Sequence, residues 1–156
     1  ARPGPLRDRL VDVGRRLDQA VDECWRIARQ GDALDGAVSQ LDADSVRLEL
    51  EQVRAERAAA DERSRDSLDR AEEAVQAQLA SIERLERVAG EARNRLRVLT
   101  AQLDEAVAQA VELSVSSADT SQLSPLSADV NSVVAELESV REALEETGAP
   151  RTGPTA

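Results

Sequence analysis

The residues best suited to chemistry in this sequence are Cys24 and Trp25, its single cysteine and single aromatic residue, which stand side by side. A nucleophilic cysteine needs a neighbouring base, usually histidine, and the sequence has no histidine. Arg26 and Arg29 would favour a thiolate, whereas the acids that adjoin them would oppose it. We interpret Cys24 and Trp25 as packing residues of a helix. An intermolecular disulfide and a redox-sensing thiol are the alternatives.

Other patterns that support catalysis or metal binding are weak. The segment at 42–45, DADS, is too short for a calcium loop and is better explained as a helix cap. Paired acids such as Glu72–Glu73 are expected by chance among 31 acidic residues. The sequence shows no glycine-rich phosphate loop and no G-x-S-x-G motif. We therefore expect no enzyme activity, no cofactor and no metal.

Negative charge is concentrated near the C-terminus. Residues 98–147 hold one arginine and 10 acids, whereas residues 1–97 hold 18 arginines and 21 acids. The acidic region is either a means of staying soluble or a docking surface for a basic partner. The candidate partner surface comprises Glu136, Glu138, Glu142, Glu145 and Glu146.

The main basic spot is the segment RNRLR with two arginines upstream. It comprises Arg84, Arg87, Arg93, Arg95 and Arg97. Nucleic-acid binding needs a broader basic stripe, and a formal net charge of −11 repels phosphate. We therefore expect no nucleic-acid partner.

The composition favours long helices. Apolar residues make up 41% and charged residues 33%, whereas aromatic residues, which usually supply much of a compact core, make up 1%. All 20 basic residues are arginine. Together with abundant Ala, Val, Leu and Gly, this usage is typical of a GC-rich bacterial genome.

Apolar residues recur in alternating steps of four and three, as on the buried face of a packed helix. Gly31 interrupts the first run, Asp42 or Asp44 caps a later helix, and Ser124–Pro125 reads as a cap followed by the first helical residue. We predict a disordered lead at 1–5, one helical domain at 6–147 and a flexible tail at 148–156. The predicted helices span 6–30, 33–41, 44–116 and 125–147.

The predicted fold class is all-α, an elongated antiparallel coiled coil or helical bundle. Its long central helix, 44–116, would carry the N- and C-terminal helices folded back on it. A fold-back at 42–44 would place Trp25 against residues 58–62. That region lies within residues 54–67, which have almost no large apolar side chain. The alternative is a break near residue 61 and a more compact four-helix stack.

These features predict a non-catalytic coiled-coil scaffold or adaptor that acts through protein–protein contacts in a bacterial cytoplasm. We expect a protein partner of unknown identity and consider a homodimer, because a narrow seam leaves apolar flanks exposed. The alternative is the soluble cytoplasmic domain of a membrane-anchored envelope or division protein. Membrane association would then require an anchor upstream of Ala1.

Overall fold

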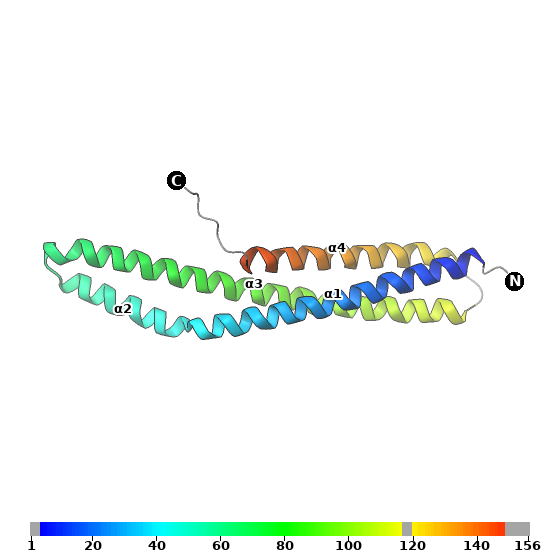
Figure 1. The fold of residues 1–156 in the computed structure, drawn as a ribbon, viewed down its shortest axis with the longest axis horizontal. Helices are drawn as coiled ribbons and strands as arrows, with labels where there is room; N and C mark the ends of the chain where they lie inside the picture. The colour runs from blue at the N-terminus through cyan, green and yellow to red at the C-terminus, as the bar shows by residue number, and fades with distance from the viewer. Residues whose placement is uncertain (1–3, 117–119, 149–156) are drawn as a thin grey trace. The chain divides into compact units, whose positions relative to one another are not determined.

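The computed structural model describes residues 4–116 and 120–148, and it confirms an all-α helical bundle. Within these two ranges there is no β-strand. The chain forms α1 (Pro5–Leu41), α2 (Ala43–Ala59), α3 (Glu62–Val115) and α4 (Leu123–Gly148), with a short 3₁₀ helix, η1 (Thr120–Gln122), before α4 (Figure 1). The first three residues of the predicted lead and residues 149–156 of the predicted tail lie outside the described residues.

The helices build two compact units, where the sequence predicted one domain. Unit 1 contains residues 1–31 and 91–156, and unit 2 contains residues 32–90. Helices α1 and α3 therefore contribute a segment to each unit. The divisions fall at Gly31 and Gly90, two of the seven glycines.

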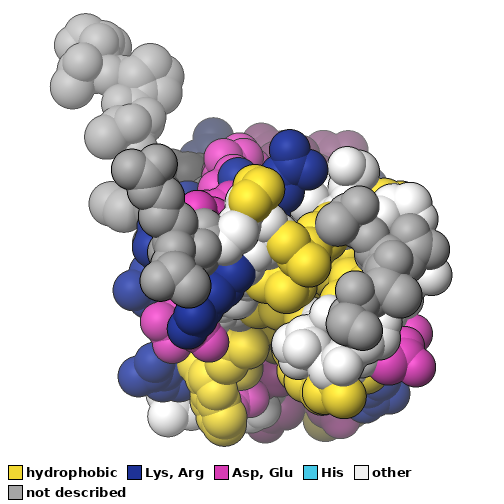
Figure 2. All heavy atoms as spheres, turned by 90° about the vertical axis from the view of Figure 1, so that its right-hand side faces the viewer, with side chains coloured by type: hydrophobic (Ala, Val, Ile, Leu, Met, Phe, Trp, Pro, Cys, Tyr) yellow, Lys and Arg dark blue, Asp and Glu magenta, His cyan; other side chains and the backbone are white. Residues whose placement is uncertain are grey.

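Unit 1 is a three-helix bundle of α1, α3 and α4. The thiol of Cys24 on α1 hydrogen-bonds with the side chain of Thr100 on α3. Arg16 Nη1 on α1 donates to Oδ1 of Asn131 on α4 at 2.7 Å. Buried aliphatic residues from all three helices fill the centre: Val13, Leu17, Ala20, Ile27, Ala92, Leu99, Leu103, Ala106, Leu113, Leu126, Val130, Val133, Leu137, Val140 and Leu144. Figure 2 views the end of this unit where α1 and α4 begin, with hydrophobic side chains lying between the helical surfaces.

Unit 2 is a helical hairpin, in which α2 and the last turns of α1 pack against α3. Its buried residues are Val38, Val46, Leu50, Val75 and Ile82. Arg47 lies opposite Glu83 and Arg54 lies opposite Glu72, so the two sides run antiparallel. A hairpin of two helices buries less apolar surface than a three-helix bundle. Leu48 and Leu41 accordingly remain 66% and 44% exposed.

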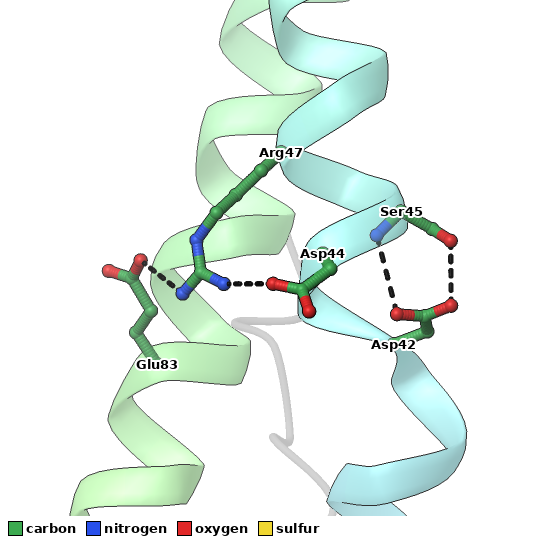
Figure 3. A network of polar contacts seen from close by, with 5 residues as sticks. All are labelled: Asp42, Asp44, Ser45, Arg47 and Glu83. Atoms are coloured by element: carbon green, nitrogen blue, oxygen red, sulfur yellow. Dashed lines mark hydrogen bonds and ion pairs between the residues drawn. The ribbon is translucent and has the colours of Figure 1, made fainter.

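Asp42 is the only residue between α1 and α2. Its backbone is left-handed, with φ 47° and ψ 77°, a conformation that Asp and Asn adopt more readily than most residues. Its carboxylate accepts hydrogen bonds from the backbone nitrogen of Ser45 at 3.3 Å and from the Ser45 hydroxyl at 2.6 Å (Figure 3). Asp42 is therefore the N-cap of α2. Of the two residues predicted to cap this helix, Asp42 and Asp44, the structure shows Asp42 in that role.

The predicted continuous helix 44–116 is wrong at Ala60 and Asp61. Helix α2 ends at Ala59, Ala60 is extended, and α3 begins at Glu62. Asp61 caps α3 by accepting a hydrogen bond from the backbone nitrogen of Ser64 at 3.0 Å. No side chain between residues 54 and 67 is buried, so an uninterrupted helix would gain no packing there. This two-residue turn reverses the chain.

The predicted break at Gly31 is also wrong, because α1 continues to Leu41. A glycine in a helix interior costs about 1 kcal/mol relative to alanine, which packing outweighs. Buried residues lie on both sides of Gly31, at Ile27 and Val38.

The predicted position of Trp25 is wrong as well. The chain folds back at Ala60–Asp61 rather than at residues 42–44. Trp25 belongs to unit 1, whereas residues 58–62 belong to unit 2, and its side chain is 64% exposed. The N-terminal segment of α1 packs instead with α3 and α4, as the Cys24–Thr100 and Arg16–Asn131 contacts show.

Candidate protein-binding groove

An open groove with a volume of about 610 Å³ lies between α3 and α4 in unit 1. Its apolar residues are Val98, Ala101, Ala106 and Val133. Val98 is 57% exposed, whereas Ala106 and Val133 are buried and close the floor. We call this feature the α3–α4 groove.

Helical spacing explains why these side chains gather. On α3, residues 101, 102, 105 and 109 each lie three, four or seven residues from residue 98 or residue 105, so all of them share one side of the helix with residue 98. On α4, residues 132 and 133 each lie three or four residues from both 129 and 136, so these four also share one side. The two sides flank the seam between the buried rows of α3 and α4. The groove is therefore the outer edge of the core.

The rim of the groove is acidic. Glu105 from α3 and Asp129 and Glu136 from α4 line it, and its remaining polar residues are Gln102, Gln109 and Ser132. No arginine is among these lining residues. An apolar floor under three carboxylates suits a protein segment that carries an apolar side chain next to basic groups.

The structure separates the acids of the predicted partner surface. All five are exposed on α4, but Glu136 alone of them lines the α3–α4 groove. Glu138 lines a different groove, between α1 and α4, together with Arg141. Glu145 lies 3.6 Å from Nε of Arg141. The predicted partner surface is therefore not a single surface, because its acids lie on more than one side of α4.

The basic spot is likewise divided. Arg84 and Arg87 belong to unit 2, and Arg93, Arg95 and Arg97 belong to unit 1; all five are exposed. Glu83, next to Arg84, pairs with Arg47 on α2 at 3.4 Å, and Arg47 also pairs with Asp44 at 2.8 Å (Figure 3). The arginines of the spot do not line a common hollow among those found in the described residues.

Cys24 and Trp25 lie in different environments. The thiol of Cys24 is free and half-buried. Burial raises the pKa of the Cys24 thiol, and the charges of Glu23 and Asp104 raise it further, against the opposing effect of the Thr100 hydrogen bond. A thiol with a raised pKa is a poor nucleophile at neutral pH. Trp25, in contrast, is on the surface.

Sequence reasoning missed most of the groove. Val98, Glu105 and Asp129 stand outside the apolar rows that predicted the helices. A local signal exists for α3, since Val98 and Glu105 are seven residues apart and so share a helix face. Nothing in the sequence indicates that Asp129 and Glu136 lie across from them, because that depends on the register of α4 against α3.

Within the described residues, no three His, Cys, Asp or Glu side chains gather as ligands of a metal ion. None of the described helices combines the length and apolar character needed to cross a bilayer. Comparison with family models, with curated proteins and with solved structures finds no match to this chain.

Proposed function

We propose that the protein is a non-catalytic helical scaffold or adaptor, and that it binds protein partners through the α3–α4 groove. The observation that carries this proposal is that the exposed apolar residues Val98 and Ala101 line the groove together with Glu105, Asp129 and Glu136. Val98 has no role in the core, because more than half of its side chain is exposed. The proposal places the protein in a bacterial cytoplasm, in line with its composition.

The chemistry of the groove defines the kind of partner. Covering the exposed residues Val98 and Ala101 removes apolar surface from water, which contributes about 25 cal/mol for each Å² buried. Three carboxylates at the rim favour arginine or lysine beside the docked apolar group and disfavour an acidic segment. The partner is therefore a helix or loop with a bulky apolar residue and adjacent positive charge.

Quantitative co-purification tests the proposal. The tagged chain is expressed in the cell that makes it, alongside a groove variant, Asp129→Arg with Glu136→Arg. The control is Glu142→Arg with Glu146→Arg, which makes the same change of charge at exposed α4 positions outside the groove. We expect the groove variant to lose co-purified protein and the control to keep it. Equal recovery with both variants would refute the groove as the binding site.

A further inference from the structure

Trp25 and its neighbours form an apolar edge with two arginines on unit 1. Trp25 is 64% exposed, and Val21, one turn earlier on the same side of α1, is 39% exposed. The neighbouring Cys24 hydrogen-bonds with Thr100 of α3, so Trp25 lies at the level of Thr100 along that helix. We call Val21, Trp25, Arg26 and Arg29 the Trp25 edge.

This edge carries charges of both signs, including two arginines close to the indole. The side chain of Arg26 is 65% exposed, and Arg29 is exposed, with its Nε donating to the backbone oxygen of Trp25 at 3.4 Å. The neighbouring Glu23 is 14% exposed and lies in ion pairs with Arg26 and Arg141. Asp22 and Asp18 are exposed acids, three and seven residues before Trp25 on the same side of α1. Two guanidinium groups therefore accompany the indole, together with two exposed carboxylates.

We infer that the α3–α4 groove is occupied by the Trp25 edge of a second copy of this chain. The groove offers an apolar floor with three carboxylates, and the edge offers an indole with two guanidinium groups. Tryptophan and arginine are the residues that most often dominate protein interfaces. The inference rests on the proposed function, because it takes the groove to be a protein-binding site and names its occupant.

The positions of the two features allow a closed, reciprocal dimer. Trp25 lies level with Thr100, and the groove is lined by α3 residues from Val98 to Gln109. The edge is on α1 and the groove is toward α4, so they flank α3 from its two sides at one level. A two-fold axis parallel to α3 therefore brings each edge to the groove of the other copy. Such an interface is isologous and closes at two copies.

The surface of α3 between the two features combines small and charged side chains. Ala101 and Ala108 are exposed and seven residues apart, so they share one face of the helix. Arg97 and Asp104 are also exposed and lie within one turn of Ala101. A second α3 related by the two-fold axis would therefore meet small side chains and charges of both signs.

The intrinsic fluorescence of Trp25 tests this inference directly, because no other aromatic residue contributes. The purified full chain is diluted in steps, and its emission maximum is recorded beside its mass by sedimentation velocity. We expect emission at shorter wavelength in the dimer, since the indole leaves water, and a shift to longer wavelength with the same midpoint as dissociation. A monomer at every concentration, or a dimer whose Trp25 emission stays that of an exposed indole, would overturn the inference.

Two variants locate the contact on each side. Trp25→Ala changes an exposed side chain, and Glu105→Arg with Glu136→Arg changes the exposed rim, so the fold is retained and circular dichroism checks it. Each is expected to weaken the dimer by about tenfold or more. The control, Glu142→Arg with Glu146→Arg, is expected to dimerise like the unmodified chain. A dimer unchanged by both test variants would overturn the inference.

A charge exchange between copies gives the sharpest result. Arg26→Glu with Arg29→Glu places acids against an acidic rim, and Glu105→Arg with Glu136→Arg places arginines against Arg26 and Arg29 of the edge. Each variant alone is expected to dimerise weakly, whereas their mixture is expected to form a heterodimer because both contacts then join opposite charges. No heterodimer in the mixture would overturn the inference. Failure here leaves the groove intact as a site for other proteins, which the co-purification experiment measures separately.

Discussion

The guanidinium of Arg141 on α4 lies 3.2 Å from the carboxylate of Glu23 on α1. Glu23 is 14% exposed at its side chain and Arg141 is 36% exposed, so solvent screens this pair only in part. With Arg16 and Asn131, which are joined at 2.7 Å, it fixes α1 and α4 in parallel. The ion pair joins α1 to α4, whereas the arrangement predicted from the sequence placed these two helices along different parts of the central helix.

A double-mutant cycle on Glu23→Gln and Arg141→Gln is expected to give a coupling free energy of about 1 kcal/mol, at the upper end for partly exposed pairs. Urea unfolding of the four proteins measures it. The coupling should shrink as salt is added, because screening weakens the attraction. A coupling of zero at low salt would show that this pair does not hold α1 to α4.

Leu137 is fully buried in unit 1, and its replacement by alanine is expected to lower the free energy of unfolding by about 2–5 kcal/mol. Leu48, which is 66% exposed, provides the matched control. Leu48→Ala should change stability by less than about 0.5 kcal/mol. Chemical denaturation followed by circular dichroism compares the two. Similar losses from both substitutions would contradict the assignment of the core.

Gly31→Ala and Gly36→Ala are each expected to stabilise the protein by about 0.5–1 kcal/mol. Both glycines lie inside α1, and an added Cβ would meet no atom within 4 Å at either position. Alanine lowers the entropy of the unfolded chain and raises helix propensity without a steric penalty. Thermal unfolding measures the effect. Destabilisation by Gly31→Ala would argue that α1 is broken there, as the sequence first indicated.

The rows of apolar residues could be predicted because the helical repeat of 3.6 residues depends only on local sequence. Apolar residues spaced four and three positions apart therefore identify the buried face of a helix. Every member of the row from Leu126 to Leu144 is buried as predicted. The turn at Ala60–Asp61 was harder, since its position depends on which distant segments pair. The sequence did mark residues 54–67 as poor in apolar residues, and that stretch is where the helix stops. The groove depends on the register between α3 and α4, which no local pattern specifies.

Cys24 is expected to make stability fall at alkaline pH. Its folded pKa is raised above the ordinary 9.0, mainly by burial, so the unfolded chain loses the thiol proton first as the pH rises. The stabilising contribution is therefore complete below pH 9.0 and is lost as the pH climbs toward the folded pKa. The chain has no lysine, tyrosine or histidine, so no other side chain titrates between about pH 7 and 11.

Urea unfolding across this range measures the effect, with Cys24→Ala as the control. The variant should lose the alkaline slope that the unmodified chain shows. Alkylation of the native thiol should also reach its half-maximal rate at a higher pH than in the unfolded chain. A native thiol that reacts at lower pH than the unfolded one would instead mark an activated cysteine.

The most direct measurement of the central claim is photo-crosslinking from inside and outside the α3–α4 groove. A photoreactive amino acid replaces Ala101, which lines the groove, or Ala135, which is equally an exposed alanine but lies on α4 outside it. Irradiation in the cell is expected to join protein to position 101, and Glu105→Arg with Glu136→Arg should abolish that product, while position 135 stays unlinked. Equal products from both positions, or none from position 101, would contradict the account.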